Sequence, residues 1–166
     1  IFNGQYGILN SFLEAIGLID DGIPWLGQTS TALICVIIAR TWQMLPWYMA
    51  FLLGGLQSVP LDQIEAARID GANNWVCFWR IILPSMKQTA ILVFMLGLIG
   101  NLQHFDLPWT MVQGGPARAT TTLSIEVYTT AFKSWDMGKA ATVGTIWAII
   151  LACFSIIYIR QANEKD

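Results

Sequence analysis

The sequence predicts an all-α integral membrane protein, and three observations carry this prediction. Of the 166 residues, 55% are hydrophobic and only 12% are charged, about half the ~25% charged residues usual in soluble domains. The apolar residues gather into three runs, each close to the ~20 residues that a helix needs to cross the hydrocarbon core. Aromatic residues near the ends of these runs fit the belts that form at membrane surfaces, namely Trp25, Trp109, Trp135 and Tyr158.

The three runs predict transmembrane helices over about residues 29–55, 86–108 and 139–160. Residues 57–85 and the tail 160–166 then lie on one side of the membrane. This side holds five Lys and Arg residues against three on the other, so the positive-inside rule predicts that the 57–85 loop is cytoplasmic. The residues counted are Arg68, Arg80, Lys87, Arg160 and Lys165 against Arg118, Lys133 and Lys139.

Several function classes are disfavoured by composition. The net charge of −2 offers no basic surface, so nucleic acid is not an expected partner. The cysteines are few and widely spaced, and we interpret Cys35, Cys77 and Cys153 as small apolar residues rather than a disulfide framework or a metal site. His104 is the single histidine, so no metal site is predicted.

The 57–85 loop predicts two short helices. Ser58 is expected to cap a helix that begins near Val59, has Pro60 in its first turn and stops near Gly71. The following segment, NNWVCFWRIILP, has the apolar spacing of an amphipathic helix on the membrane surface, ended by Pro84.

Charged and small residues are mixed in the first of these helices, and its role has two interpretations. The charges solvate a loop that only separates the spans, or they pair with a protein that docks closely against the small residues. Asp70 also fits the N-cap of the following helix, a local role with no partner.

Residues 65–84, EAARIDGANNWVCFWRIILP, resemble the EAA loop of the inner-membrane permeases of binding-protein-dependent ABC importers. The shared pattern is Glu-Ala-Ala, then a Gly after three residues, then a hydrophobic stretch to Leu-Pro. GLQSVP before the loop and FDLPWTMVQGGPARATTTLSIEVYTTAF after it resemble segments of carbohydrate permeases of the maltose- and glycerol-phosphate-type first permease. Because the family has about six spans and the chain starts at Ile1 within a polar stretch, we expect residues 1–166 to be the C-terminal part of one permease domain, with its last three spans.

The resemblance implies that the loop helix is a coupling helix, which docks in a groove of a cytoplasmic ABC ATPase. Glu65 would pair with a basic residue of the ATPase, and the small residues would allow close contact. The implied coupling residues are Glu65, Ala66, Ala67, Arg68, Asp70 and Gly71.

The resemblance also implies the wider assembly. The expected partners are the ATPase, a second permease subunit, an extracytoplasmic solute-binding protein and membrane lipid, in a bacterial or archaeal inner membrane. The chain would bind no cofactor and catalyse no reaction, because ATP is hydrolysed by the partner ATPase. Its function would be that of a multi-pass sugar permease.

Polar residues within the spans point to a solute path. An Arg at a helix centre costs roughly 2.5–3.5 kcal/mol on insertion scales, so Arg40 is expected to face a wet cavity or a partner. Polar and aromatic residues recur at helical spacing on one face of the first span, and small and polar residues do so on the second. The resemblance implies that these positions bind sugar, namely Arg40, Gln43, Met44, Trp47, Gly97, Gly100 and Asn101.

Two alternatives remain open for these residues. Gly97 and Gly100 also suit helix packing, and Arg40 also suits snorkelling or pairing with an acidic residue. The family more often has an uncharged polar residue at the position of Arg40, which leaves room for an anionic ligand such as a uronate or a phosphorylated polyol.

Residues 109–138 predict a turn at Gly114, Gly115 and Pro116 and a short amphipathic helix in TLSIEVYTTAF. In the family this segment is a re-entrant loop near the solute-binding protein, and an interfacial helix that anchors the last span is the other interpretation.

Two further function classes remain open beside the permease. One is an ATP-independent secondary transporter or channel fragment, and the other is a membrane enzyme that uses His104 and Asp106. The resemblance implies a structural role for Asp106, which matches the Phe-Asp position of the family.

Overall fold

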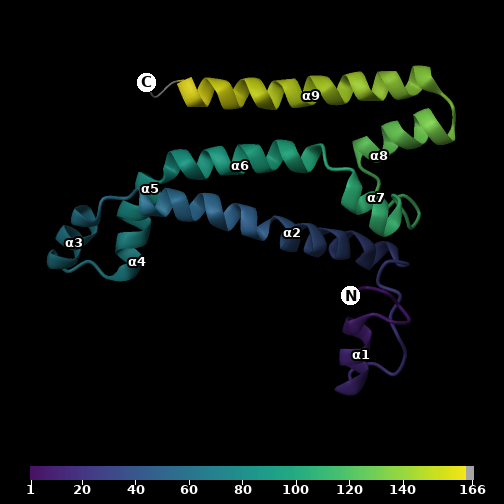
Figure 1. Ribbon diagram of the computed structural model, residues 1–166, viewed down its shortest axis with the longest axis horizontal. Helices are drawn as coiled ribbons and strands as arrows, with labels where there is room; N and C mark the ends of the chain where they lie inside the picture. The colour runs from purple at the N-terminus through teal and green to yellow at the C-terminus, as the bar shows by residue number, and fades with distance from the viewer. Residues whose placement is uncertain (164–166) are drawn as a thin grey trace. The chain divides into compact units, whose positions relative to one another are not determined.

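The computed structural model describes residues 1–163, and this part of the chain contains helices but no β-strand (Figure 1). The all-α prediction is therefore confirmed. Lys165, counted above in the cytoplasmic tail, lies outside the described residues. The chain divides into two compact units: Ile1–Gln43 with Leu102–Phe154, and Met44–Asn101 with the chain from Ser155.

Two helices are long and apolar enough to cross a membrane: α2 (Thr29–Gln57) and the Met137–Ile156 part of α9 (Met137–Asn163). They match the predicted spans over 29–55 and 139–160, each with a few further residues. Only 17% of the apolar window of α2 and 6% of that of α9 is buried within the chain, so most of their apolar surface needs lipid or another protein. Pro46 lies inside α2, where it cannot donate to the carbonyl of Trp42.

The prediction of one helix over residues 86–108 is wrong. Helix α6 (Lys87–Leu102) has only 16 residues, and the helical segment Asn74–Ser85 precedes it at an angle of 70°. Taken together, the two pieces are long and apolar enough to form one bent span. The described residues therefore contain two candidate spans, or three if the bent pair is counted as one.

Pro108 removes one hydrogen bond that a single helix over residues 86–108 would need. Proline has no amide hydrogen, so the carbonyl of His104 cannot receive the helical bond from residue 108. That carbonyl instead accepts a hydrogen bond from the Ser124 hydroxyl at 3.2 Å. A new helix, α7 (Asp106–Val112), starts two residues before the proline, which falls in its first turn.

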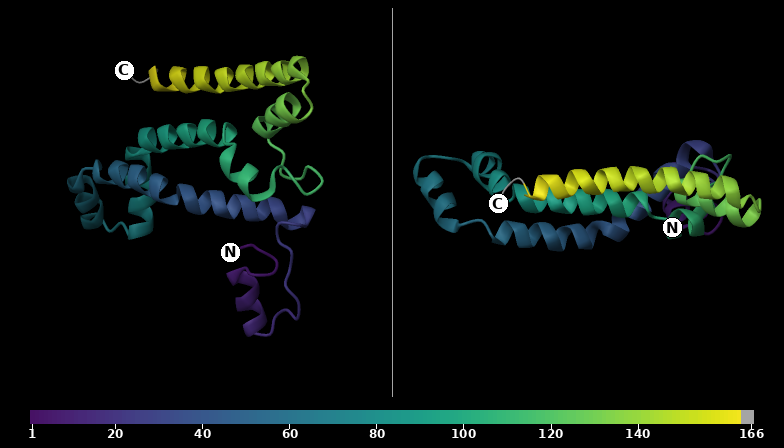
Figure 2. Two further views of the ribbon diagram at one scale, coloured as in Figure 1. Left: turned by 45° about the vertical axis from the view of Figure 1, so that its right-hand side comes forward. Right: turned by 90° about the horizontal axis from the view of Figure 1, so that it is seen from above.

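In the second unit, the C-terminal half of α2 and α6 lie side by side (Figures 1 and 2). Their backbones approach closely near Gly55, where an added Cβ would lie 2.8 Å from Cγ2 of Thr89. The short helices between them gather at one end of this pair. The second unit thus presents two surfaces: the short helices at its end and a groove between α2 and α6.

In the first unit, the side chain of Asn10 holds the N-terminal segment against helix α1. Helix α1 (Ile8–Ala15) carries this side chain, which is only 2% exposed. Its Nδ2 donates to the carbonyls of Gly4 and Ile23 at 2.9 and 3.0 Å. Its Oδ1 accepts a 2.6 Å hydrogen bond from the indole N–H of Trp25. One buried amide therefore fixes both arms of the loop on α1.

We expect Asn10→Ala to open the N-terminal segment. The change leaves three partly buried polar groups without their partner, at about 1–3 kcal/mol for each group that stays dry. Hydrogen exchange of residues 4–25 should become much faster in the variant. Gln5→Ala, at an exposed position of the same loop, is the control, and unchanged exchange in Asn10→Ala would contradict this role.

The segment between α7 and α9 forms a compact part of the first unit. Its turn has left-handed backbone at two pairs of positions, Gln113–Gly114 and Ala117–Arg118, with φ of 50° at Gln113 and 85° at Gly114. Helix α8 (Leu123–Tyr128), capped by the Thr122 hydroxyl, continues into the π-helix η2 (Thr129–Lys133). The predicted turn and short helix are confirmed. Trp109 stacks on Phe105 and lies 4.7 Å from Lys133 Nζ, which fixes α7 against this helix.

Candidate functional sites: an exposed helical turn and an intramembrane groove

Helix α3 (Leu61–Ile69) carries four of the predicted coupling residues, Glu65, Ala66, Ala67 and Arg68, and the other two, Asp70 and Gly71, follow it directly. It begins at Leu61 rather than near Val59, because a residue before proline is disfavoured in the α region and Pro60 itself is extended, with ψ of 123°. The predicted cap by Ser58 is wrong, since the Ser58 hydroxyl donates instead to the carbonyl of Gly55 at the end of α2.

The predicted stop at Gly71 is confirmed, and its geometry is that of a Schellman motif. The amide of Ala72 donates to the carbonyl of Ala67 at 2.9 Å, and the amide of Gly71 donates to the carbonyl of Arg68 at 3.1 Å. Gly71 has φ of +87°, which a residue with a Cβ adopts only with strain. The motif sets the angle at which the chain leaves α3, and Arg68 strengthens this link through a 3.4 Å hydrogen bond to Asn74.

One face of α3 exposes two large aliphatic side chains on either side of a carboxylate. Leu61 is 70% exposed and Ile69 is 87% exposed, and the exposed carboxylate of Glu65 stands between them at i, i+4, i+8 spacing. Ile64 and Ala67 are only half-buried, and no residue of α3 is fully buried. We call Leu61, Glu65 and Ile69 the exposed strip of α3. Exposed large aliphatic residues of this kind are typical of a surface that another protein covers.

The helical segment after α3 comprises α4 (Asn74–Cys77), the π-helix η1 (Phe78–Ile82) and α5 (Leu83–Ser85). Asn73 is its N-cap and accepts from the amide of Val76 at 2.9 Å, so the alternative that Asp70 caps this helix is wrong. Pro84 does not end the helix as predicted. The π-type turn directly before Pro84 accommodates the carbonyl that the proline cannot satisfy, and the bend comes two residues later.

The predicted solute-path residues of the first unit form a polar pair. The guanidinium Nη1 of Arg40 donates to Oε1 of Gln43 at 2.8 Å, one turn further along α2. This bond orients the Gln43 amide and presents a cationic and a neutral polar group on one face of an otherwise apolar helix.

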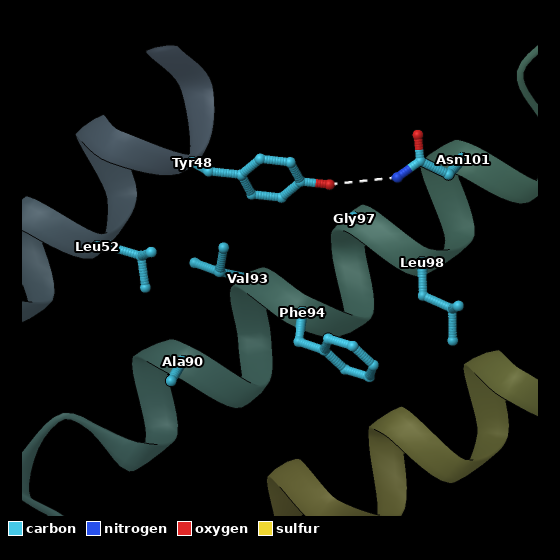
Figure 3. Close-up of a pocket in the computed structure, with 8 residues that line it drawn as sticks. All are labelled: Tyr48, Leu52, Ala90, Val93, Phe94, Gly97, Leu98 and Asn101. Atoms are coloured by element: carbon cyan, nitrogen blue, oxygen red, sulfur yellow. Dashed lines mark hydrogen bonds between the residues drawn. The ribbon is translucent and has the colours of Figure 1, made fainter. Parts of the chain in front are cut away.

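In the second unit, α6 and α2 form a groove with a volume of about 360 Å³ (Figure 3). Asn101 Nδ2 donates to the hydroxyl of Tyr48 at 3.2 Å across the groove. Gly97 lies under the same ring, and an added Cβ would lie 2.9 Å from Tyr48 Cε1 and closer still to the hydroxyl. The lining residues are Tyr48, Leu52, Ala90, Val93, Phe94, Gly97, Leu98 and Asn101.

The structure therefore brings together two of the predicted path residues, Gly97 and Asn101, through a residue that the sequence analysis missed. In the sequence, Tyr48 is one more aromatic residue in an apolar run, and the helical spacing points only to its neighbour Trp47. Met44, Trp47 and Gly100 do not line this groove. Trp47 packs edge-on against Tyr48, with ring centroids 5.1 Å apart, so it contacts a residue that lines the groove.

The two glycines of α6 make a matched pair for a stability test. A Cβ at Gly100 would meet nothing within 4 Å, whereas one at Gly97 would displace the Tyr48 ring. Gly→Ala in a helix gains about 1 kcal/mol, so Gly100→Ala should raise the thermal midpoint. Gly97→Ala should lower it relative to Gly100→Ala, and adding Tyr48→Ala should remove the difference, measured as a double-mutant cycle in the purified protein. Equal midpoints for the two single variants would contradict the packing of Tyr48 on Gly97.

His104 and Asp106 do not form an acid–base pair. Within residues 1–163, the buried Nε2 of His104 has no hydrogen-bond partner, and the His104 carbonyl is taken by Ser124. Burial most of all, and then the Arg40 guanidinium, lower the pKa of His104, which follows the end of α6, while Asp106 opposes this shift. Asp106 opens α7 at the positive end of the helix dipole.

Comparisons with known proteins agree with this architecture. The family model described as the binding-protein-dependent transport system inner membrane component matches residues 7–166. The chain is 38% identical over 164 residues to a probable ABC transporter permease protein of Brucella suis biovar 1, over 99% of this chain and 57% of that protein. It is 32% identical over 165 residues to the trehalose/maltose transport system permease protein MalF of Thermococcus litoralis, over 99% and 55% of the two chains.

A solved structure has the same fold. The crystal structure of a bacterial alginate ABC transporter, in complex with an alginate pentasaccharide-bound periplasmic protein, matches with a TM-score of 0.84 and 20% identity. The match covers 98% of this chain and 56% of that one, so the chain spans little more than half the length of the proteins it resembles. With 160 of its 166 residues inside the family model, the chain belongs to the family of inner membrane components of binding-protein-dependent transport systems, the ABC transporter permeases.

Proposed function

We propose that the protein is the permease subunit of an ATP-driven sugar importer and that α3 couples it to a cytoplasmic ABC ATPase. The observation that carries this proposal is the exposed strip of α3, where Leu61 and Ile69 flank the carboxylate of Glu65. Apolar side chains with a single central charge suit a groove that has apolar walls and one basic residue. The Schellman motif and the Arg68–Asn74 hydrogen bond hold the C-terminal end of the helix at a set angle, so this end can transmit force rather than yield.

The transmission of that force follows from the local hydrogen bonds. Gly71 and Ala72 lock the end of α3, Arg68 joins it to Asn74, and the bent segment leads directly into α6. When two ATPase subunits close on ATP, α3 moves with the groove that holds it. Because α6 forms one wall of the groove that contains Asn101, displacement of α6 changes the access to that groove.

The proposed membrane arrangement has three spans, with Asn74–Ser85 and Lys87–Leu102 counted as one bent crossing. The loop with α3 then faces the cytoplasm, on the side of the membrane to which the sequence assigns five Lys and Arg residues against three. The segment from α7 to η2 lies on the opposite side, where a solute-binding protein delivers the solute. A second permease subunit would cover the apolar surfaces that α2 and α9 leave exposed.

Sugars are the proposed solute class. Relatives of this chain are named as permeases for trehalose/maltose, in Thermococcus litoralis, and for sulfoquinovosyl glycerol, in Agrobacterium fabrum at 29% identity over 99% of this chain and 53% of that protein. Hydroxyl groups suit the amide of Asn101, the hydroxyl of Tyr48 and the Arg40–Gln43 pair. The charge of Arg40 favours a sugar that carries a carboxylate or another anionic group.

Uptake by the complete transporter tests this function. The full-length protein is reconstituted in proteoliposomes with its second permease and ATPase, and the solute-binding protein is added on the opposite side. We expect accumulation of labelled disaccharides or uronate oligosaccharides only when the binding protein and hydrolysable ATP are both present. Accumulation driven by an ion gradient without ATP would contradict the proposal and favour a secondary transporter.

A further inference from the structure

Helix α1 buries a polar side chain and exposes apolar ones, the reverse of the usual pattern for a helix packed on its own chain. Its most buried side chain is the polar Asn10, at 2% exposure. Three large apolar side chains point the other way, while Leu9 and Leu13 are half-buried: Ile8 is 72% exposed, Phe12 is 60% exposed and Ile16, directly after the helix, is 52% exposed. These three residues follow i, i+4, i+8 spacing, so they form one apolar face.

This face does not result from a loose attachment of α1. The Asn10 amide binds Gly4, Ile23 and Trp25, and the Trp25 carbonyl accepts a 2.6 Å hydrogen bond from the Thr31 hydroxyl in the first turn of α2. The network holds the polar side of α1 against its own loop, so the apolar side must face outward. The outward face therefore needs an apolar environment outside the first unit.

The position of α1 indicates which environment this is. The segment leads straight into α2, and α1 lies near the N-terminal end of that span and runs across its direction rather than along it (Figures 1 and 2). A helix that crosses the end of a span at such an angle lies close to the plane of the membrane surface. An amphipathic helix in this plane buries its apolar face at the boundary between headgroups and acyl chains.

The charges of the segment agree with this position. Residues 1–28 contain Glu14, Asp20 and Asp21 but no Lys or Arg. The acidic side chains are exposed and lie off the apolar face, where water can solvate them. Attraction to anionic headgroups is therefore not what holds the segment, and apolar contact must do so.

We propose that α1 is an interfacial anchor, with Ile8, Phe12 and Ile16 inserted into the lipid leaflet at the start of α2. The Asn10 network serves to present this face to the bilayer. The anchor acts through lipid alone and is independent of which solute the transporter carries.

Site-directed spin labelling of the full-length protein in its complete transporter tests the proposal. Phe12→Cys is labelled on a cysteine-free background, in vesicles of neutral phosphatidylcholine, and Asp20→Cys is the water-facing control. We expect the label at position 12 to collide with O₂ far more often than with a water-soluble nickel chelate, and the label at position 20 to do the reverse. Ile8→Cys carries the same test if Phe12→Cys fails to assemble.

Two results would overturn the anchor. A label at position 12 that is as accessible to nickel as the one at position 20 would place the face in water. A label shielded from both reagents would place it against protein, such as a second permease subunit or another part of the full chain. Neither result depends on transport, so the anchor and the proposed function can fail separately.

Discussion

Glu65→Lys should abolish ATP-dependent uptake while leaving membrane insertion intact. Glu65 is exposed in the middle of the strip on α3, so no contact within its own unit depends on it for folding. In the proposed groove, reversing its charge sets it against a basic residue of the ATPase. Loss of one partner of an interfacial charge pair costs about 2–5 kcal/mol, and reversal adds repulsion.

The measurement is co-purification of the ATPase with the variant, followed by uptake in proteoliposomes. Gln63→Lys is the matched control, because it adds a positive charge to an exposed position on the other side of α3. We expect the control to retain the ATPase and most of its uptake. Equal loss in both variants would mean that the net charge of the loop, rather than the strip, is what matters.

Arg40→Ala should weaken solute binding within the membrane and leave ATPase association unchanged. A hydrogen bond to a charged group contributes about 1.5–3 kcal/mol, which corresponds to roughly a 10- to 150-fold loss of apparent affinity for a solute that contacts the guanidinium. Removing the guanidinium also releases the Gln43 amide that it orients at 2.8 Å.

The concentration dependence of uptake measures this effect. Thr41→Ala is the neighbouring control, because the Thr41 hydroxyl already donates to the carbonyl of Ile37 in its own helix. Arg40→Gln distinguishes the solute classes: it should retain much of the affinity for a neutral sugar and lose it for an anionic one. Unchanged uptake of the cognate solute by Arg40→Ala would remove Arg40 from the path.

The parts of the fold that depend on residues close together along the chain could be predicted from the sequence. The end of α3 at Gly71 follows from a left-handed position that glycine adopts without strain, and the long spans follow from runs of apolar residues. Prolines were the main source of error. Pro108 lies in the first turn of α7, after a break in the helix that the sequence did not predict, and Pro84 follows a π-type turn instead of ending its helix.

The groove could be predicted only in part, because it depends on how α6 packs on α2. Gly97 and Asn101 stood out as small and polar residues in an apolar run, but their common partner Tyr48 did not. The spacing within one helix cannot show which side chain of another helix will fill the space that a glycine leaves. The same limit applies to Asn10, whose partners are up to 15 residues away along the chain.

Crosslinking from α3 to the ATPase tests the central claim most directly. Ala66→Cys in the full-length protein, in native membranes that contain the whole transporter, is treated with a short bifunctional thiol reagent. We predict a crosslinked product with the ATPase whose yield changes when ATP is bound, and none from Lys139→Cys at the start of α9. If position 66 never crosslinks to the ATPase while the transporter imports its solute, α3 is not the coupling element.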